Sequence, residues 1–302
     1  MMSNTTMFFW VIIIFVICLF IFFPGPANNI LDDVLGRDPV IVVNNPPPAV
    51  VTPPAIIPNT DTEPTITSSD HFSVANWNLQ IFGISKAAEP ELMNDYAAII
   101  SNYDIVFIQE IRDISEVAFP QLCSLLNGYT CEISSRAGRS SSKEQYGIIY
   151  RDNIELVSVT DYNPDSLDRW ERPPIKADFI IDGYELSIYN LHSKPTDVQM
   201  ELRGLQNIVS NTGNELIIGD LNADCSYYDA YYGTEFDDWN WVIGDDEDTT
   251  VSTTNCAYDR IIFNDEAYEE YYSSGILREG ITSSHSDHYL VWTTINKEEA
   301  EQ

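Results

Sequence analysis

The chain has 302 residues, 44% of them hydrophobic and 12% aromatic, which is enough to bury one large core or two small ones. Its 47 acidic residues outnumber its 15 Lys and Arg residues and give a formal net charge of −32 at pH 7. This charge excludes nucleic-acid binding through a broad basic surface, because most affinity for DNA comes from cations that meet phosphates. A polyanionic substrate then requires divalent metal ions, local basic residues or high salt. We interpret the acidic surface itself as an adaptation for solubility or a saline medium.

The first 69 residues contain an apolar segment and a Pro-rich segment. Phe8 to Phe23 is an uninterrupted apolar run, longer than most signal-peptide cores and slightly short of the usual ~20-residue membrane span. No clear small-residue cleavage site follows it, so residues 1–23 are predicted to be a transmembrane signal-anchor, with a cleaved signal peptide as the alternative. Residues 24–69 are rich in Pro and poor in aromatic residues, which predicts a disordered stalk.

The cysteines indicate an oxidising compartment. Cys18 lies in the apolar run, and no Cys or His spacing typical of zinc sites is present. Four cysteines behind an export segment predict two disulfides and an extracellular location for the part of the chain that carries them. Their spacing favours the pairs Cys123–Cys131 and Cys225–Cys256, although the sequence alone allows three pairings.

From about Ser69, apolar strand-like runs alternate with helical or loop segments. The expected strands are Phe72–Asn78, Ile105–Ile108, Tyr146–Tyr150, Ile154–Val159, Ile175–Ile180, Leu186–Leu191, Leu216–Ile218, Asp259–Phe263 and Tyr289–Thr294. The expected helices are Glu91–Ser101, Phe119–Leu126 and Val198–Ser210. Many strands, few helices and no internal repeat predict one α/β sandwich over residues 70–296, followed by an acidic tail over residues 297–302.

Polar side chains recur at the ends of these strands, where α/β proteins build their sites. They are Asn78, Glu110, His192, Asp220, Asn222, Asp259, Asp287 and His288. Gly219 is expected to let the chain turn at the end of its strand. Asp220 and Asn222 point the same way only if the strand period of two continues to Asn222. They then suit a hard cation or a developing phosphorane charge; an Asx-rich turn is the alternative.

Several motifs in chain order resemble the endonuclease/exonuclease/phosphatase superfamily and, more narrowly, its deoxyribonuclease I-like members. They are Trp77-Asn-Leu-Gln-Ile-Phe-Gly83, Asp104-Ile-Val-Phe-Ile-Gln-Glu-Ile-Arg-Asp113, Lys143-Glu-Gln-Tyr146, Leu191-His-Ser-Lys-Pro195, Gly219-Asp-Leu-Asn-Ala-Asp-Cys-Ser-Tyr227, Thr254-Asn-Cys-Ala-Tyr-Asp-Arg260 and Ser286-Asp-His288. The resemblance runs from about Phe72 to Ile295. It implies a four-layer sandwich of two packed mixed β-sheets flanked by helices.

The resemblance also implies metal sites and a structural disulfide. Glu110 would be the principal Mg²⁺ ligand, with Asn78 and Asp287 beside it. A structural Ca²⁺ site would be formed by Asp248, Thr250, Ser252 and Thr254, for which an ordinary polar turn is the alternative. Cys225–Cys256 would match the disulfide of the family.

The same resemblance implies two histidine–carboxylate pairs. His192 would be oriented by Glu144, and His288 by Asp259; we expect the first pair to supply the acid and the second the base. Asp220 and Asn222 would hold the scissile phosphate and its metal. Arg112 and Arg172 would contact the DNA backbone or minor groove, with structural ion pairs as the alternative.

The chain departs from the family in regions that bind the DNA groove. Ser142 replaces the family's minor-groove tyrosine, and the segment Asn163 to Glu171 is short and lacks the family's second cysteine pair. The sequence therefore predicts a monomeric, membrane-tethered, extracellular DNA endonuclease that needs divalent metal and leaves 5′-phosphate ends. No protein partner is expected. The alternatives are a phosphodiesterase that acts on a phospholipid head group and a non-catalytic binding module.

Overall fold

The structure, a computed structural model, describes residues 70–229 and 233–297, all within the compact unit Thr62–Gln302. The predicted signal-anchor and stalk (1–69) and the end of the predicted acidic tail (298–302) lie outside the described residues. Among the described residues no helix is both long enough and apolar enough to cross a membrane.

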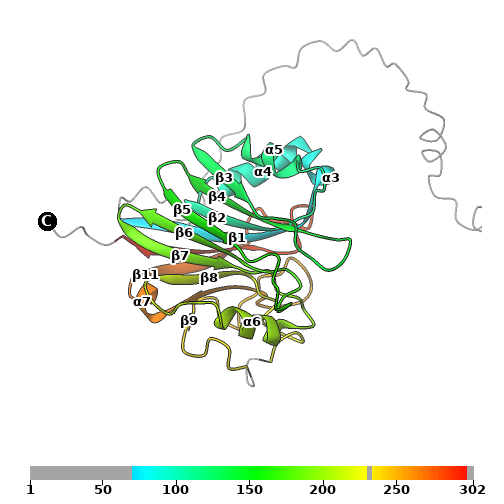
Figure 1. The fold of residues 1–302 in the computed structure, drawn as a ribbon. Helices are drawn as coiled ribbons and strands as arrows, with labels where there is room; N and C mark the ends of the chain where they lie inside the picture. Colours follow the sequence, from blue (N-terminus) through cyan, green and yellow to red (C-terminus); the bar gives the residue numbers. More distant parts are fainter. Residues whose placement is uncertain (1–69, 230–232, 298–302) are drawn as a thin grey trace, which may run out of the picture. The chain divides into compact units, whose positions relative to one another are not determined.

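Two six-stranded sheets form the framework (Figure 1). The first sheet has, in spatial order, β11 (Tyr271–Leu277), β12 (Leu290–Asn296), β1 (His71–Phe82), β2 (Ile105–Ile111), β4 (Gln145–Arg151) and β3 (Tyr129–Ile133). The second has β5 (Glu155–Asp161), β6 (Ile175–Ile181), β7 (Tyr184–Asn190), β8 (Glu215–Asp220), β10 (Asp259–Phe263) and β9 (Asn240–Trp241). The pairs β1–β2 and β7–β8 are parallel and the other pairs are antiparallel, so both sheets are mixed.

Three hydrophobic clusters bind the layers together. Side chains from both sheets, such as Phe107 and Phe179, share the inner cluster. The outer face of the first sheet packs against α3 (Ile84–Ala87), α4 (Pro90–Ile100) and α5 (Ala118–Cys123). The outer face of the second sheet packs against α6 (Val198–Gln206), and the short α7 (Asp265–Tyr268) follows β10 (Figure 1). The four-layer α/β sandwich expected from the sequence is confirmed.

The burial of each element explains its sequence. β2 and β8 lie in the middle of their sheets, and their apolar runs are buried on both faces. β6 instead alternates between buried and half-buried residues, as a strand with one face toward a core does. In α4, Met93, Tyr96 and Ile100 are buried at helical spacing, so one side of this helix faces the sheet.

The topology brings the polar strand ends together. In the parallel pairs β1–β2 and β7–β8, the carboxyl ends of both strands lie at the same edge of a sheet. Asn78 lies in the carboxyl-terminal half of β1, and Glu110 is the second-last residue of β2. His192 follows the end of β7, and Asp220 is the last residue of β8. β10 is antiparallel to β8 and begins at Asp259, directly opposite Asp220.

Some elements differ from expectation. β3, β9, β11, α3 and α7 were not expected, and β1 extends four residues beyond Asn78, to Phe82. The sequence of β11 has no clear alternating pattern. At Gly275 the ring of Trp292 packs against the β11 backbone, and a Cβ atom there would lie 2.7 Å from the ring. Gly219 lies inside β8, not at a turn, so that expectation was wrong. Glycine is required at this position because a Cβ atom would lie 2.0 Å from the carbonyl oxygen of Leu191, the residue that follows β7.

Candidate active site

Two histidines meet at one carboxylate oxygen. His192 turns Nδ1 to Glu144 Oε2, at 3.0 Å, and Nε2 to Asp220 Oδ2, at 3.3 Å. His288 turns Nδ1 to Asp259 Oδ2, at 2.7 Å, and Nε2 to the same Asp220 oxygen, at 3.5 Å. Each imidazole therefore lies between a carboxylate of its own and the shared Asp220. The structure brings together both pairs named from the sequence.

The shared carboxylate, Asp220, is buried and ionised. Asp220 Oδ2 also accepts a hydrogen bond from Asn78 Nδ2 at 2.9 Å. Burial acts to raise the pKa of Asp220, but His288, His192 and the Asn78 hydrogen bond outweigh it and hold the pKa below its usual value. An ionised Asp220 can bind a cation or the proton-bearing edge of either imidazole.

The histidine backbones are also held by hydroxyl groups. The Tyr146 hydroxyl accepts the N–H of His192 at 3.0 Å, and the Ser286 hydroxyl accepts the N–H of His288 at 3.0 Å. The Ser286 hydroxyl in turn donates to the carbonyl of Asn78 at 2.5 Å. Tyr146 and Ser286 were not selected from the sequence. The available signal was their position two residues from Glu144 and His288, respectively.

The two oxygens of Glu110 have different partners. Its Oε2 atom accepts the N–H of Ile81 at 2.8 Å and pairs with Arg112 at 3.1 Å. Its Oε1 atom faces Asn78 Nδ2 at 3.4 Å. Because the same Asn78 amide contacts Asp220, the carboxylates of Glu110 and Asp220 converge on one point.

This donor set fits a hard divalent cation, which prefers carboxylate and amide oxygens. Within the described ranges, the groups of three close metal-binding side chains near the cleft are Glu110, Glu144, His192 and Asp220, Asp259, His288. Asp287 belongs to neither group; it is half-exposed and its carboxylate lies 3.8 Å from His288 Nε2. The structure therefore joins Asn78 to Glu110, while no described contact joins Asp287 to them.

Asn222 reaches the site by a different route from the one considered in the sequence. β8 ends at Asp220, and Asn222 has a positive φ of 49°, so the strand period does not continue. The Asn222 amide nitrogen donates to the carbonyl of Ser193 at 3.0 Å, which places the side chain beside the His192 loop. Glu110 also has a positive φ, 59°, which is uncommon for a residue other than glycine.

Both arginines selected from the sequence pair with site carboxylates. Arg172 donates to Glu144 at 2.8 Å and to the carbonyls of His192 and Ser193 at 2.9 and 2.8 Å, and its side chain is 11% exposed. Arg112 pairs with Glu110 and lies 3.8 Å from Glu144. The structure thus gives both residues the ion pairs that the sequence left as the alternative.

Charged neighbours set the ionisation of Glu144. Burial acts to raise its pKa, but His192, Arg172 and Arg112 outweigh burial and lower the pKa to about 2. Glu144 is therefore a carboxylate at any physiological pH, and it keeps His192 in one orientation.

Both predicted disulfides are present. Cys225–Cys256 links the loop after β8 to the segment before β10, so it ties Asp220 and Asn222 to the strand of Asp259. Cys123–Cys131 links α5 to β3 in the outer layer of the first sheet.

The loop named from the sequence as a Ca²⁺ site is internally bonded. Asp248 accepts the N–H and the hydroxyl of Thr250 at 3.0 and 2.8 Å, and the Thr250 hydroxyl also lies 2.7 Å from the Thr254 carbonyl. The hydroxyls of Ser252 and Thr254 contact each other. The loop also supports the active site, because Val251 donates to the carbonyl of Asp287 at 2.7 Å. The buried Thr249, missed in the sequence, accepts the N–H of Asp259 at 3.1 Å.

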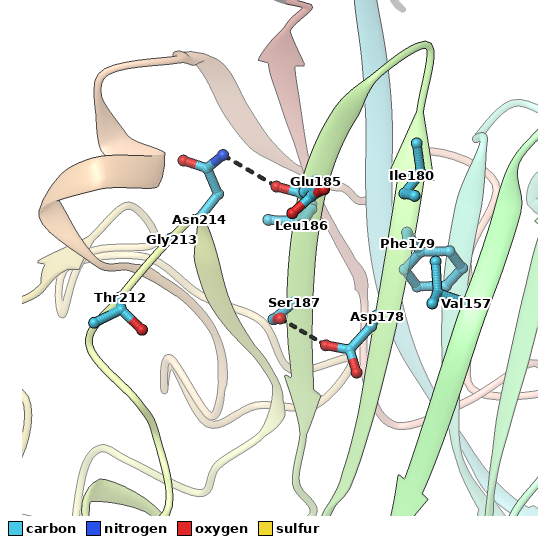
Figure 2. A pocket seen from close by; sticks show the side chains of 10 residues that line it. All are labelled: Val157, Asp178, Phe179, Ile180, Glu185, Leu186, Ser187, Thr212, Gly213 and Asn214. Carbon is cyan, nitrogen blue, oxygen red and sulfur yellow. Dashed lines mark hydrogen bonds between the residues drawn. The ribbon is translucent and has the colours of Figure 1, made fainter.

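A separate pocket of about 310 Å³ lies on the face of β5, β6 and β7 that points away from the first sheet (Figure 2). Figure 2 shows Asp178 bonded to the Ser187 hydroxyl, at 2.7 Å, and Glu185 bonded through its carbonyl to Asn214. The pocket shares no residue with the histidine–carboxylate cluster and contains no histidine.

Comparisons with known proteins agree with the geometry. The model of the Endonuclease/Exonuclease/phosphatase family matches residues 75–288. Pig deoxyribonuclease-1 is 30% identical over 259 residues, which cover 74% of this chain and 91% of the relative. Mouse deoxyribonuclease-1-like 2 is 32% identical over 214 residues, 63% of this chain and 75% of the relative.

Solved structures show the same fold. A Bacteroides thetaiotaomicron endonuclease/exonuclease/phosphatase family protein superposes with a TM-score of 0.57 at 19% identity, covering 76% of this chain and 95% of that one. D. rerio TDP2, in complex with a single-strand DNA product, superposes with a TM-score of 0.56 at 15% identity, covering 75% of this chain and 99% of that one.

Proposed function

Since the chain belongs to the endonuclease/exonuclease/phosphatase family as a deoxyribonuclease I-like hydrolase of phosphodiester bonds, we propose that its substrate is DNA and that it leaves 5′-phosphate ends. The observation that carries the proposal is the meeting of His192 and His288 at one oxygen of Asp220, each with its own carboxylate behind it. Hydrolysis of a phosphodiester needs one group to take a proton from water and another to protonate the leaving oxygen, and two oriented imidazoles provide both.

A divalent cation, Mg²⁺ in our proposal, would be held by Glu110 and Asp220, with Asn78 and Asp287 beside them. When bound, such a cation lowers the pKa of water and neutralises charge on the phosphate. Glu110 fits this role because two donors fix one of its oxygens, while the other accepts only a long hydrogen bond, at 3.4 Å, from Asn78. Asn222 would then hold the phosphate from the side of the His192 loop.

His288 carries a charge before any cation binds. Burial acts to lower the pKa of His288, but Asp259 and Asp220 outweigh it and raise the pKa to about 10. A histidine with this pKa is protonated at neutral pH and donates protons. The sequence assigned the base to His288 and the acid to His192, and that assignment requires the pKa of His288 to fall below neutrality when a cation binds. An NMR titration of His288 with and without Mg²⁺ measures this directly; an unchanged pKa near 10 would reverse the two roles.

We propose supporting roles for the remaining residues selected from the sequence. Arg112 and Arg172 hold Glu110 and Glu144 in place, since their charged groups contact these carboxylates. A Ca²⁺ ion at Asp248, Thr250, Ser252 and Thr254 would stabilise the loop that bonds to Asp287. Equilibrium dialysis of the protein and a D248N variant with ⁴⁵Ca²⁺ tests that site, and equal binding by the two would disprove it.

One assay tests the proposed substrate. The full-length protein is offered plasmid DNA, sphingomyelin and a phosphoinositide, each with Mg²⁺ and Ca²⁺ and again with EDTA. We expect plasmid nicking that EDTA and the H192A substitution abolish. Hydrolysis of a lipid but not of DNA would identify a phospholipid phosphodiesterase. Hydrolysis of neither substrate would leave only a binding module.

We also propose that residues 1–23 tether the protein to a membrane, with the catalytic domain outside. The two disulfides support an extracellular domain, because such bonds persist in oxidising compartments. Protease treatment of intact cells, followed by detection of the domain, tests this orientation. Protection of the domain from protease, or its release into the medium, would contradict tethering to the outer surface.

A further inference from the structure

Three buried amide side chains lie between the two sheets, next to the residues of the proposed active site. Asn76 in β1, Gln109 in β2 and Asn190 in β7 are all completely buried. In each strand, the residues two and four positions earlier belong to the apolar cluster that the sheets share, so the strand period places the three amides on the inner faces of the sheets. Amides inside an apolar core are costly unless they form hydrogen bonds.

The three amides bond to one another across the sandwich. Asn190 Nδ2 donates to Asn76 Oδ1 at 3.0 Å and to the carbonyl of Ile218, in β8, at 2.8 Å. Gln109 Nε2 donates to Asn190 Oδ1 at 3.0 Å and also to Asn76 Oδ1. Asn76 and Gln109 belong to the first sheet, whereas Asn190 belongs to the second. We call these hydrogen bonds among Asn76, Gln109 and Asn190 the amide bridge.

The amide bridge adjoins the groups that we assign to the cation. On the first sheet, Gln109 immediately precedes Glu110 and lies beside Asn78 in the β1–β2 register. On the second sheet, the carbonyl of Ile218, which accepts from the bridge, is two residues before Asp220. Asn78 and Asp220 then meet across the sheets, at 2.9 Å. The position of Glu110 relative to Asp220 therefore depends on how the sheets are aligned at the bridge.

The alignment matters because the proposed cation site is shared between the sheets, with Glu110 on the first and Asp220 on the second. Apolar side chains attract one another without a preferred direction, so an apolar core alone leaves two sheets free to shift slightly. A hydrogen bond fixes both the distance and the angle between its partners. A displacement of about 1 Å costs a catalytic site about 10²-fold in rate.

Stability alone does not account for the bridge. Asn76 Nδ2 and Gln109 Oε1 have no hydrogen-bond partner among the described residues. Buried polar atoms without a partner destabilise a fold, and apolar groups of the same shape in place of all the partners are neutral or stabilising. The bridge therefore costs stability at the level of the fold where the site needs alignment.

We propose that Asn76, Gln109 and Asn190 are positioning residues, whose hydrogen bonds align the two sheets so that Glu110 and Asp220 can bind one cation. This inference rests on the proposed assignment of these two carboxylates to Mg²⁺. It predicts that loss of the bridge weakens Mg²⁺ binding and slows catalysis by more than the loss of stability explains.

The first test compares two variants of the full-length protein. N190L removes the centre of the bridge, because leucine has the shape of asparagine but forms no hydrogen bond. The matched control is F179L: Phe179, in β6, belongs to the same apolar cluster and lies beside Leu186, four residues before Asn190 in β7. Both variants should unfold at a lower temperature than the wild type.

Two readouts separate alignment from stability. Isothermal titration calorimetry measures Mg²⁺ affinity, with E110Q identifying the heat that belongs to the site. Hydrolysis of bis(p-nitrophenyl) phosphate at saturating Mg²⁺, well below the melting temperatures, measures kcat without DNA contacts. We expect N190L to weaken Mg²⁺ binding and to lower kcat by about 10- to 100-fold each, as changes behind metal ligands do. KM should change little, and F179L should leave affinity and kcat unchanged.

The triple variant N76L/Q109M/N190L is the second test. It replaces every amide of the bridge with an apolar group of similar shape, so it should regain the stability that N190L loses. It should not regain Mg²⁺ affinity or kcat. If the triple variant does not fold, the comparison of N190L with F179L decides; if N190L does not fold, Q109M replaces it, because Q109M keeps the bond between Asn190 and Asn76.

Three results would overturn the inference: wild-type Mg²⁺ affinity and kcat in N190L, equal losses in F179L, or recovery of affinity and kcat together with stability in the triple variant. The last result would mean that filled space aligns the sheets without hydrogen bonds. Equal Mg²⁺ binding by E110Q and the wild type would remove the cation assignment, and the inference with it. A protein that cleaves no DNA would disprove the nuclease function, while Mg²⁺ affinity would still test the bridge.

Discussion

The site has two halves, His192 with Glu144 and His288 with Asp259. They share one arrangement but differ in the charges that surround their carboxylates. In each half an imidazole lies between its own carboxylate and Asp220, and a hydroxyl holds the imidazole's backbone N–H. Glu144 is contacted by Arg172 and lies near Arg112, and its pKa falls to about 2. Asp259 is completely buried, and none of the described arginines pairs with it. One of its oxygens has no hydrogen-bond partner among the described residues, and burial raises its pKa.

The difference identifies what keeps each carboxylate charged. Glu144 is ionised because permanent guanidinium charges surround it, so it orients His192 whatever the charge of that histidine. Asp259 depends on the charge of His288, and His288 depends on Asp259 and Asp220 for its raised pKa. Arginines therefore keep the His192–Glu144 half charged, whereas the charges of the His288–Asp259 half depend on each other and on Asp220. We call the second the self-supporting half. The predictions below test this contrast, from the largest expected effect to the smallest.

Replacing Asp259 by Asn should give the largest loss of activity. The amide cannot stabilise a charged His288 and fixes the imidazole less well, and a comparable change in a serine protease triad lowers kcat about 10⁴-fold. We expect a loss of about 10³- to 10⁴-fold in kcat on plasmid DNA and a loss of stability at neutral pH, because the variant leaves the buried, protonated His288 without its nearest carboxylate. Steady-state kinetics and urea unfolding measure the two effects.

Replacing Glu144 by Gln should cost less activity. Arg172 still holds the carbonyls of His192 and Ser193, so we expect a loss of only about 10²-fold in kcat, within the usual range for a positioned acid–base group. The variant leaves Arg172 buried without its carboxylate, which destabilises a protein by about 3 to 5 kcal/mol. If E144Q proves as stable as the wild type, or loses as much kcat as D259N, the contrast between the halves is incorrect.

The two halves should also lose their contributions to stability at opposite ends of the pH scale. The pKa of Glu144 in the fold, about 2, is below its ordinary value of 4.5, so its stabilisation is present above pH 4.5 and is lost as the pH falls toward 2. The pKa of His288, about 10, is above its ordinary value of 6.5, so its stabilisation is complete below pH 6.5 and is lost as the pH rises through 10.

Urea unfolding in EDTA at a series of pH values measures both effects against the E144Q and H288Q variants. The difference between wild type and E144Q should shrink only on the acid side, by about 3 kcal/mol for a shift of this size. The difference between wild type and H288Q should shrink only on the alkaline side. Parallel curves for either variant would show that its group does not have the shifted pKa.

The sequence selected side chains that the structure brings close together, but it predicted the strand boundaries less well. Asn78, Glu110, His192 and Asp220 were found because each follows an apolar run, and parallel strands bring such ends to one edge. β11 was missed because its Ser-Ser-Gly sequence has no period of two, and its stability comes from the neighbouring β12. Tertiary packing, which a single sequence does not display, determined that strand.

Side-chain partners were the second feature that the sequence did not determine. The motifs name Arg112 and Arg172, but whether an arginine faces a substrate or a carboxylate depends on what the fold places beside it. Glu144 is distant from Arg172 in the chain and becomes its neighbour only when the segments before β4 and before β6 meet. Tyr146 and Thr249 likewise acquire their roles from contacts with His192 and Asp259, far along the chain.

The two disulfides provide the smallest effect and the last test of the contrast. The sequence separation is 31 residues for Cys225–Cys256 and 8 for Cys123–Cys131. Loop entropy therefore predicts a stabilisation of about 3.7 kcal/mol for the first disulfide and about 2.5 kcal/mol for the second. Their effects on activity should differ, because only Cys225–Cys256 joins the loop of Asp220 to the strand of Asp259. We expect the C225S/C256S variant to lose about tenfold in kcat beyond its loss of stability, measured well below its melting temperature, whereas C123S/C131S keeps the kcat of the wild type. Equal kcat values for the two variants would mean that the self-supporting half does not need this covalent link, and that Thr249 and the β8–β10 pairing are sufficient to hold Asp259 opposite Asp220.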